Sequence, residues 1–200
     1  PRREVTRYYQ GNIPWITSAD LKEGSDYVSE ARFHITEEAI ESSATRIVPE
    51  GNLLFVSRTG VGKVAIAGMD VCISQDFTGI IPKTDLIDTR YLFRFLQAKQ
   101  AYFVNYQRGA TIKGVTRRVI EELPVPLPPL PEQRRIAGVL DAADGLRAKR
   151  RAALGKLDAL LQSVFLEMFG DPVRNERGWE VTKLDNVVSY IGSGITPLGG

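Results

Sequence analysis

The 200-residue sequence predicts an α+β fold, in which a compact mixed α/β domain carries a long protruding coiled-coil helix. Three observations lead to this prediction. Apolar, β-branched runs separated by glycine occupy residues 53–81 and are typical of short strands. Residues 88–106 have helical spacing, with Leu92, Phe95, Leu96 and Phe103 on the side that can cover a sheet. Residues 131–169 carry a heptad repeat, which is typical of a helix that pairs with another helix.

The elements of the domain are expected in the following order. Residues 1–30 combine turn formers and aromatic side chains with little periodicity, so we expect short strands and loops. A short helix is expected over Ile35–Ser43, because Thr36 can cap its amino end and two glutamates suit its first turn. One compact sheet is then expected from the strands Leu53–Ser57, Lys63–Ala67, Val71–Ser74 and Thr78–Ile81. After a polar loop over residues 107–116, the prolines of residues 123–131 keep the chain extended.

The longest predicted element is a helix from Pro131 to Phe169, which Gly170 and Pro172 end. At about 1.5 Å per residue it would be roughly 55 to 60 Å long, too long for a small domain to cover, so it needs a partner helix. Apolar or small side chains recur along it in steps of about four and three residues, interrupted only by Arg150. This row, the heptad seam, contains Val139, Ala143, Leu146, Ala153, Leu157, Leu160 and Val164. We expect a dimer or subunit interface at Val139, Ala143, Leu146, Leu157, Leu160 and Val164.

Composition limits the classes of protein to consider. No run approaches the roughly twenty apolar residues of a membrane span, and a single cysteine cannot form an internal disulfide, so we expect a cytoplasmic protein without a membrane partner. The net charge of +2 hides an uneven distribution. Residues 1–50 carry six Lys/Arg and nine Asp/Glu, whereas residues 51–120 carry ten and four. Such an imbalance favours a basic face that binds a polyanion.

Catalytic chemistry has little material in this sequence. The Gly60–Lys63 loop suggests phosphate binding, but Ser57 stands where a phosphate loop needs its first glycine and Val64 where it needs Ser or Thr. His34 is the only histidine and lies at the start of the predicted short helix, so no zinc site or Cys/His nucleophile pair is expected. Cys72 is interpreted as a small core residue. We therefore expect no catalytic residue and no metal site.

Polar loops are the better candidates for function. They mix arginine, lysine, glutamine and hydroxyl side chains, which bond to phosphates and base edges, although a solvated loop without a partner is the simpler alternative. The candidate DNA-binding residues are Arg58, Thr59, Lys63, Gln75, Lys113, Thr116 and Arg117.

Four stretches resemble one protein family, the DNA specificity subunit of type I restriction-modification systems. They are IPWITSADL (13–21), SRTGVGKVA (57–65), GATIKG (109–114) and, most specifically, VPLPPLPEQRRIA (125–137). The resemblance implies a target recognition domain that reads one half of a split double-stranded DNA site. It also implies long helices that pair antiparallel, and methyltransferase (M) and restriction (R) subunits as partners. The subunit itself would be no enzyme and have no cofactor, because S-adenosylmethionine, ATP and Mg²⁺ belong to the partner subunits.

The order of the pieces differs from that family. A recognition domain of the family opens with a segment like residues 178–184 and a turn like residues 193–197, and continues into a segment like residues 8–15. We therefore assign residues 1–130 to the main part of the recognition domain, 131–169 to the spacer and dimerisation helix, and 170–200 to a linker and completing segment. Two accounts fit: a circularly permuted half-subunit that folds back on itself, which we favour, or a piece whose last residues start a second domain.

The single long helix implies a homodimer, in which two copies pair antiparallel and the two identical recognition domains read an inverted-repeat split site. Two other classes stay open at this point. A different DNA-binding module, such as a regulator or part of a fused restriction-methylation enzyme, would have the same basic loops but would not copurify with a methyltransferase subunit. A coiled-coil adaptor without a nucleic-acid role would not be retained on DNA.

Overall fold

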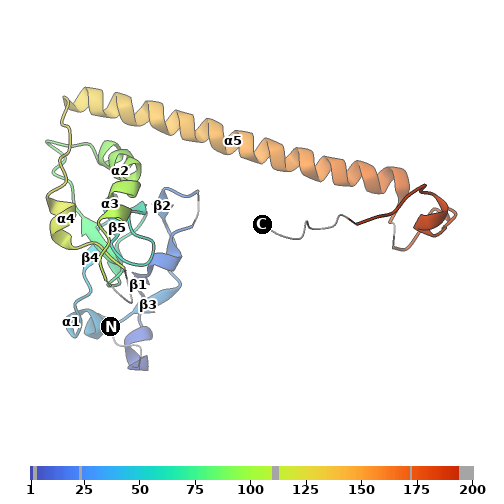
Figure 1. Ribbon diagram of the computed structural model, residues 1–200. Coiled ribbons are helices and arrows are strands. Elements are labelled where there is room, and N and C mark those ends of the chain that lie inside the picture. The colour runs from blue at the N-terminus through green and yellow to red at the C-terminus, as the bar shows by residue number, and fades with distance from the viewer. Residues whose placement is uncertain (2–3, 23, 110–112, 172, 194–200) are drawn as a thin grey trace, which may run out of the picture. The chain divides into compact units, whose positions relative to one another are not determined.

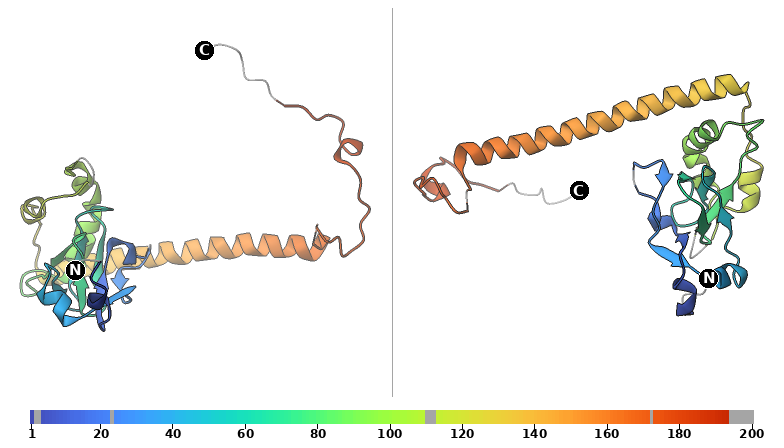
Figure 2. Two further views of the ribbon diagram at one scale, coloured as in Figure 1. Left: turned by 90° about the horizontal axis from the view of Figure 1, so that it is seen from below. Right: turned by 180° about the vertical axis from the view of Figure 1, so that it is seen from behind.

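The structure is a computed structural model that describes residues 1, 4–22, 24–109, 113–171 and 173–193 (Figure 1). The chain divides into two compact units, Pro1–Ala148 and Lys149–Gly200. Helix α5 (Leu130–Phe169) is continuous, as both views of Figure 2 show, and its residues contribute to both units. Its bounds confirm the long helix expected from the heptad repeat to within one residue, and sheets and helices together confirm the α+β class.

The first unit contains two four-stranded sheets rather than the single sheet expected. Their strand orders are β3 (Phe33–Ile35), β1 (Ile13–Ile16), β7 (Val71–Ile73), β4 (Ile47–Val48), and β2 (Tyr27–Val28), β6 (Val64–Ala67), β5 (Leu53–Val56), β8 (Phe77–Ile80). The pairs β1–β7 and β2–β6 are parallel and the others antiparallel. The four expected strands exist, but the prediction that they form a single sheet was wrong. Strand β7 pairs with β1 of the other sheet, which places Trp15 opposite Cys72.

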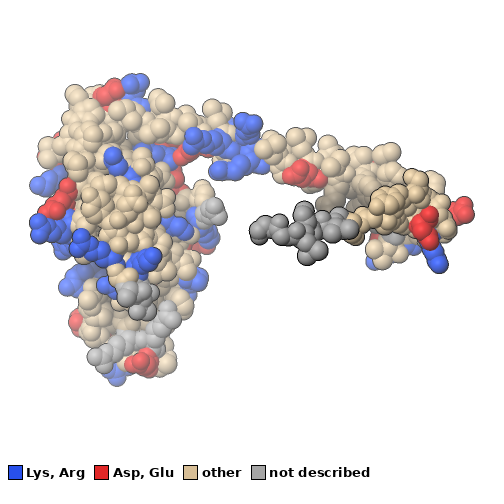
Figure 3. All heavy atoms as spheres, in the orientation of Figure 1, with Lys and Arg blue, Asp and Glu red and all other residues tan. Residues whose placement is uncertain are grey.

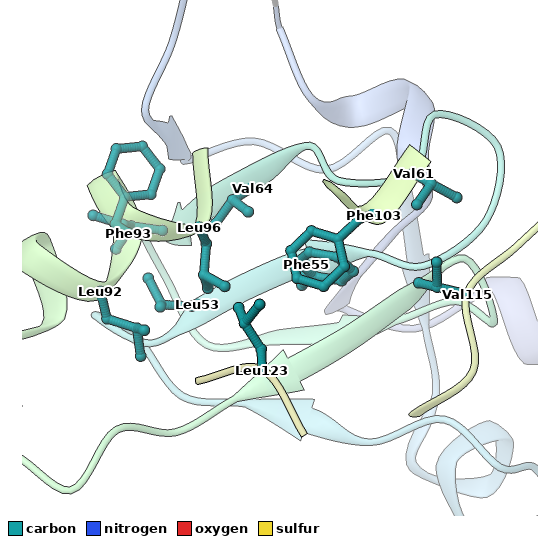
Figure 4. Close-up of a cluster of buried hydrophobic side chains, with 11 residues drawn as sticks. Leu53, Phe55, Val61, Val64, Leu92, Phe93, Leu96, Phe103, Val115 and Leu123 are labelled. Atoms are coloured by element: carbon teal, nitrogen blue, oxygen red, sulfur yellow. The ribbon is translucent and has the colours of Figure 1, made fainter. Parts of the chain in front are cut away.

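Alternation along the strands explains how the layers stack. Successive side chains point to opposite faces of a strand, so Leu54 and Val56 of β5 pack between the two sheets, while Leu53 and Phe55 face the helices. Figure 4 shows the apolar layer between β5 and the helices, in which Phe103 lies against Phe55 at a ring-centroid distance of 4.6 Å. A third cluster with Trp15, Ile35, Ala39 and Cys72 covers the outer face of the first sheet.

The short helices cover these sheets. They are α1 (Glu37–Glu41), α2 (Thr89–Ala98), α3 (Gln100–Asn105) and α4 (Arg117–Glu121), with 3-10 turns η1 (Thr6–Tyr9), η2 (Ser18–Asp20) and, in the second unit, η3 (Leu184–Asn186). The Thr36 cap is confirmed, since its hydroxyl accepts from Ala39 N at 3.3 Å. The single helix expected over residues 88–106 is two helices that meet at Lys99. His34 lies in β3 rather than at a helix start, because the chain pairs with β1 up to Ile35.

A buried glutamine fastens the amino end of α5 to the first unit. Gln133 is fully buried, and its side-chain oxygen accepts from Asp88 N at 2.8 Å. Its side-chain nitrogen donates to Leu86 O at 3.1 Å and to Pro128 O at 2.8 Å. Both polar atoms of the side chain thus have hydrogen-bond partners, which explains structurally why a glutamine follows Pro131 and Glu132.

Two opposite faces of α5 differ in their surroundings. Ala137, Asp141 and Asp144 lie on the face toward the first unit, where Ala137 is buried and the aspartates meet arginines of α2. The heptad-seam residues Val139, Ala143 and Leu146 each follow one of these by two positions, an offset of about 200° around a helix. Leu146 and Leu157 are 67% and 59% exposed. The described residues of the chain therefore leave the seam uncovered.

The second unit is held by local contacts after the end of α5. Gly170 has a left-handed backbone, with φ of 76°, as expected for the residue that ends the helix. Trp179 donates from Nε1 to Phe169 O at 3.1 Å, and its backbone N donates to Asn175 Oδ1 at 2.9 Å. The turn of residues 193–197, on which the fold-back account depends, lies outside the described residues except for Ser193.

Candidate nucleic-acid interface

Three loops of the first unit are joined by backbone hydrogen bonds. The hairpin after β5 meets the loop between β7 and β8 where Ser57 N donates to Asp76 O at 2.7 Å. The loop after α3 joins them where Val115 N donates to Ser57 O at 3.0 Å. Gly114 forms isolated bridges with both Arg58 and Arg108, and an added Cβ would lie 2.9 Å from Ser57 O. A glycine is therefore needed where the first and third loops touch.

This junction brings together several of the predicted residues. Arg58, Gln75 and Lys113 are exposed and come from three different loops. Thr116 follows Val115 and precedes α4, and its hydroxyl makes no capping bond. Arg108 is also exposed at the junction; it was counted in the basic region of residues 51–120 but was not among the candidate DNA-binding residues. Within the described ranges, the side chains of Arg58, Arg108 and Lys113 form no ion pair, so their charge is open to a polyanion.

The remaining candidates have other surroundings. Thr59 has a left-handed backbone, with φ of 48°, at the tip of the hairpin. Lys63 lies on the returning arm of that hairpin and lines a polar hollow with Lys22 and Gln100. Arg117 donates from Nε to Glu121 Oε1 at 2.7 Å, so a carboxylate already balances part of its charge. These three residues are exposed, but the junction does not include their side chains.

A polar hollow of about 540 Å³ adjoins the junction and was not foreseen. It is lined by Gln75 and Asp76 of the second loop together with Trp15, Thr45 and Arg46. The indole Nε1 of Trp15 is buried and has no hydrogen-bond partner in the described part of the chain. The only signal in the sequence was the aromatic run near residue 15.

The basic region expected over residues 51–120 is smaller than its charge count suggests. Arg90 and Arg94, which belong to that count, are bound to aspartates instead of facing a ligand. Burial alone would favour neutral Asp141, but hydrogen bonds from both arginines lower the pKa of this carboxyl below its ordinary value. Figure 3 shows Lys and Arg spread over the visible face of the first unit, with a further group along the middle of α5.

The glycine loop lacks the surroundings of a nucleotide site. A phosphate loop leads from a strand into a helix whose amino end binds the phosphate, whereas Gly60–Lys63 connects β5 to β6. Cys72 is buried, and burial raises the pKa of its thiol, which disfavours the reactive thiolate. In the part of the chain that is described, no group of three or more His, Cys, Asp or Glu is placed to hold a metal ion.

The described helices were also compared with the length and hydropathy of a membrane span. None of them is both long and apolar enough to cross a bilayer.

Comparison with known proteins points to one family. The family model described as "Type I restriction modification DNA specificity domain" matches residues 2–155. The type I restriction enzyme MjaIX specificity subunit of Methanocaldococcus jannaschii is 30% identical over 210 residues, which cover 94% of this chain and 48% of the relative. The EcoR124I/EcoR124II specificity subunit of Escherichia coli is 24% identical over 151 residues, which cover 72% of this chain and 37% of the relative.

Solved structures share the fold. The HsdS subunit of Thermoanaerobacter tengcongensis matches with a TM-score of 0.61 at 21% identity, over 82% of this chain and 38% of the other. A second match is a chain from a structure of the type I R-M system that concerns complex assembly and conformational transition. Its TM-score is 0.64 at 22% identity, over 78% of this chain and 37% of the other. This chain thus spans about half the length of these relatives, or less. By the match to the family model, the chain belongs to the type I restriction-modification DNA specificity domain family.

Proposed function

We propose that this chain is a non-catalytic DNA-recognition module that reads one half of a bipartite site and directs methyltransferase and restriction subunits to it. The observation that carries the proposal is the junction of three loops, which presents Arg58, Arg108 and Lys113 without ion-pair partners among the described residues. Membership of the DNA specificity domain family supports the same reading. S-adenosylmethionine, ATP and Mg²⁺ would act in the partner subunits.

Two kinds of contact are expected at the junction. The arginines and lysine supply affinity for phosphates, which is independent of sequence and falls with salt. Gln75 is the candidate for base reading, because a carboxamide can bond in a bidentate way to adenine, a contact worth about 1–3 kcal/mol of discrimination. The adjoining hollow is lined by Arg46 as well as Gln75, so it adds a second polar side chain beside the candidate base reader.

The test replaces Arg58, Lys113 and Arg117 together by alanine and measures duplex DNA binding by fluorescence anisotropy over a salt series. Each phosphate contact contributes about 0.9 to the slope of log K against log salt, so the slope should become shallower by up to about 2.7. Arg117 is included because it is exposed beside Thr116, and its pairing with Glu121 makes it the weakest contributor.

The matched control replaces Arg7, Lys22 and Arg135 by alanine, which removes the same charge. Each of these is exposed and paired with a glutamate outside the junction. The control should keep most of the slope. Equal slopes and affinities for the wild-type chain and the triple variant of Arg58, Lys113 and Arg117 would show that the DNA surface lies elsewhere. No retention of the wild-type chain on DNA at moderate salt would favour the adaptor reading.

The exposed heptad seam supports a homodimer as part of this proposal. If two α5 helices pair antiparallel about a centre between Arg151 and Ala152, Val139 faces Val164 and Leu146 faces Leu157 of the second copy. Small side chains then face large ones, since Ala143 meets Leu160 and Arg150 meets Ala153. The pairing holds two identical recognition domains on one twofold axis, as an inverted-repeat site requires.

Residues 170–200 are assigned in this proposal to the linker and the segment that completes the recognition domain. The described part of this segment exposes apolar side chains, among them Trp179, Val181 and Tyr190, at 56%, 81% and 84%. Such residues usually gain a covering partner, which completion of a recognition domain would provide. Energy transfer between labels on the two ends of a monomer tests this, and widely separated ends would contradict it.

A further inference from the structure

A cluster of two arginines and three aspartates joins α5 to the rest of the first unit. Arg94 donates from Nε to Asp141 Oδ1 at 2.7 Å, from Nη1 to Asp144 Oδ2 at 2.5 Å and from Nη2 to Asp26 Oδ2 at 3.1 Å. Arg90 donates from Nε to Asp141 Oδ2 at 3.0 Å and from Nη2 to Asp26 Oδ2 at 3.0 Å. The cluster thus ties three segments together: α2, α5 and the loop before β2.

Apolar packing contributes little to holding α5 against this unit. Among the described residues of α5, only Gln133 and Ala137 are buried, and Ala137 offers a single methyl group. Gln133 fastens the first turn, and the cluster acts two to three turns further along. Two fixed points along one helix define its direction, whereas the first point alone leaves it free to tilt.

The arginines are themselves held rigidly. The side chain of Arg94 is only 5% exposed, and the guanidinium groups of Arg90 and Arg94 lie 5.1 and 5.2 Å from the ring centre of fully buried Phe93. Asp26 is fixed through its backbone, since its carbonyl accepts from Ile66 N of β6 at 2.8 Å. Ion pairs with several directional bonds from planar guanidinium groups restrict orientation more than a point charge does.

We infer that this cluster is a positioning device, which fixes the direction in which α5 leaves its recognition domain and thereby sets the spacing between the two DNA half-sites. The part about spacing rests on the proposed function. About 38 Å of helix follow Asp144, so a tilt of about 10° would move the far end by about 7 Å, or about two base-pair steps. A rigid anchor at Arg90 and Arg94 is therefore the condition for reading a split site with one spacer length.

The test replaces Asp141 and Asp144 by asparagine in the full chain, which keeps the side-chain volume and removes both acceptor charges. Spin labels on Glu41→Cys in α1 and Ala148→Cys in α5, in a Cys72→Ala background diluted with excess unlabelled protein, report the distance by double electron–electron resonance. The distribution should broaden about twofold, because the helix samples more directions. The control is Glu132→Gln, which breaks the exposed ion pair with Arg135 on the same helix.

DNA spacing gives the second measurement. Half-sites that the wild-type chain selects from a random library are placed at different separations, and the variant should accept neighbouring separations while its affinity for one half-site stays unchanged. An unchanged label distribution would overturn the inference. If the double variant does not fold, Asp144→Asn alone, at a half-exposed aspartate, should broaden the distribution in the same direction, and no broadening would overturn the inference as well. A wild-type chain that binds no DNA would refute the proposed function. The spin-label distances would still test whether the cluster fixes the direction of α5.

Discussion

Replacing Gln133 by alanine should destabilise the first unit far more than its single polar side chain suggests. The change removes three hydrogen bonds at 2.8, 3.1 and 2.8 Å and leaves the partly buried N–H of Asp88 without its side-chain acceptor. A buried polar group left unpaired costs about 1–3 kcal/mol, and two carbonyls lose their donor in addition, so we expect a loss of about 3 kcal/mol. That is a large share of the total stability of about 5–15 kcal/mol for a typical domain.

Urea unfolding measures this loss. In a Trp179→Phe background the fluorescence of Trp15 reports on the unit that contains Gln133. The urea midpoint should fall while the slope m stays unchanged, because the surface area exposed on unfolding stays the same. Gln162→Ala is the matched control, since Gln162 is exposed on the same helix, and it should change stability by less than about 0.5 kcal/mol. A loss below about 1 kcal/mol for Gln133→Ala would refute the role given to its three bonds.

Three further predictions concern the heptad seam and one buried carboxylate. Leu157→Asp, with Leu146 of the second copy as its proposed neighbour, should weaken dimerisation by about 3 kcal/mol or more, measured by sedimentation, and unchanged association would place the interface elsewhere. Arg150→Leu should tighten the same dimer, because it removes the one charge from the seam; weaker association would argue for a different register. Burial alone would raise the pKa of Asp20, but hydrogen bonds from Arg32 and Thr17 lower this pKa below the ordinary value of 3.8. The ionised carboxylate therefore stabilises the folded state above pH 3.8, and this contribution is lost as the pH falls through the lowered pKa of the folded state. Stability of Asp20→Asn should therefore depend less on pH between about pH 5 and pH 2 than that of the wild type, as urea unfolding at each pH would show.

Local patterns were sufficient for most elements of the fold. The apolar runs marked β5, β6, β7 and β8 because strand formation depends on neighbouring side chains, and Thr36 marked α1 because capping acts within three residues. The partner of a strand is a different matter. Nothing near Cys72 indicates that it will lie opposite Trp15 in a parallel pair, since that choice depends on contacts far apart in the sequence. The second sheet was therefore missed.

The candidate interface was predictable to the same extent. Loop chemistry identified Arg58, Gln75 and Lys113, and the structure brings their loops together through backbone bonds that no side-chain pattern encodes. Charge counting failed at Arg90 and Arg94, because an arginine on a helix is expected to face solvent unless its carboxylate partners are known. Those partners come from positions 26, 141 and 144, which are neighbours only in the folded chain.

The two faces of α5 have a consequence for exchanging parts between proteins of this kind. The face with Gln133, Asp141 and Asp144 is matched to arginines and backbone groups of its own domain, whereas the opposite apolar face needs only another seam of the same spacing. A hybrid protein joined at the proline segment would separate the aspartates from their arginines. A fusion point beyond Asp144 keeps the aspartates with their arginines, so the smallest transferable unit of recognition includes the first four turns of α5.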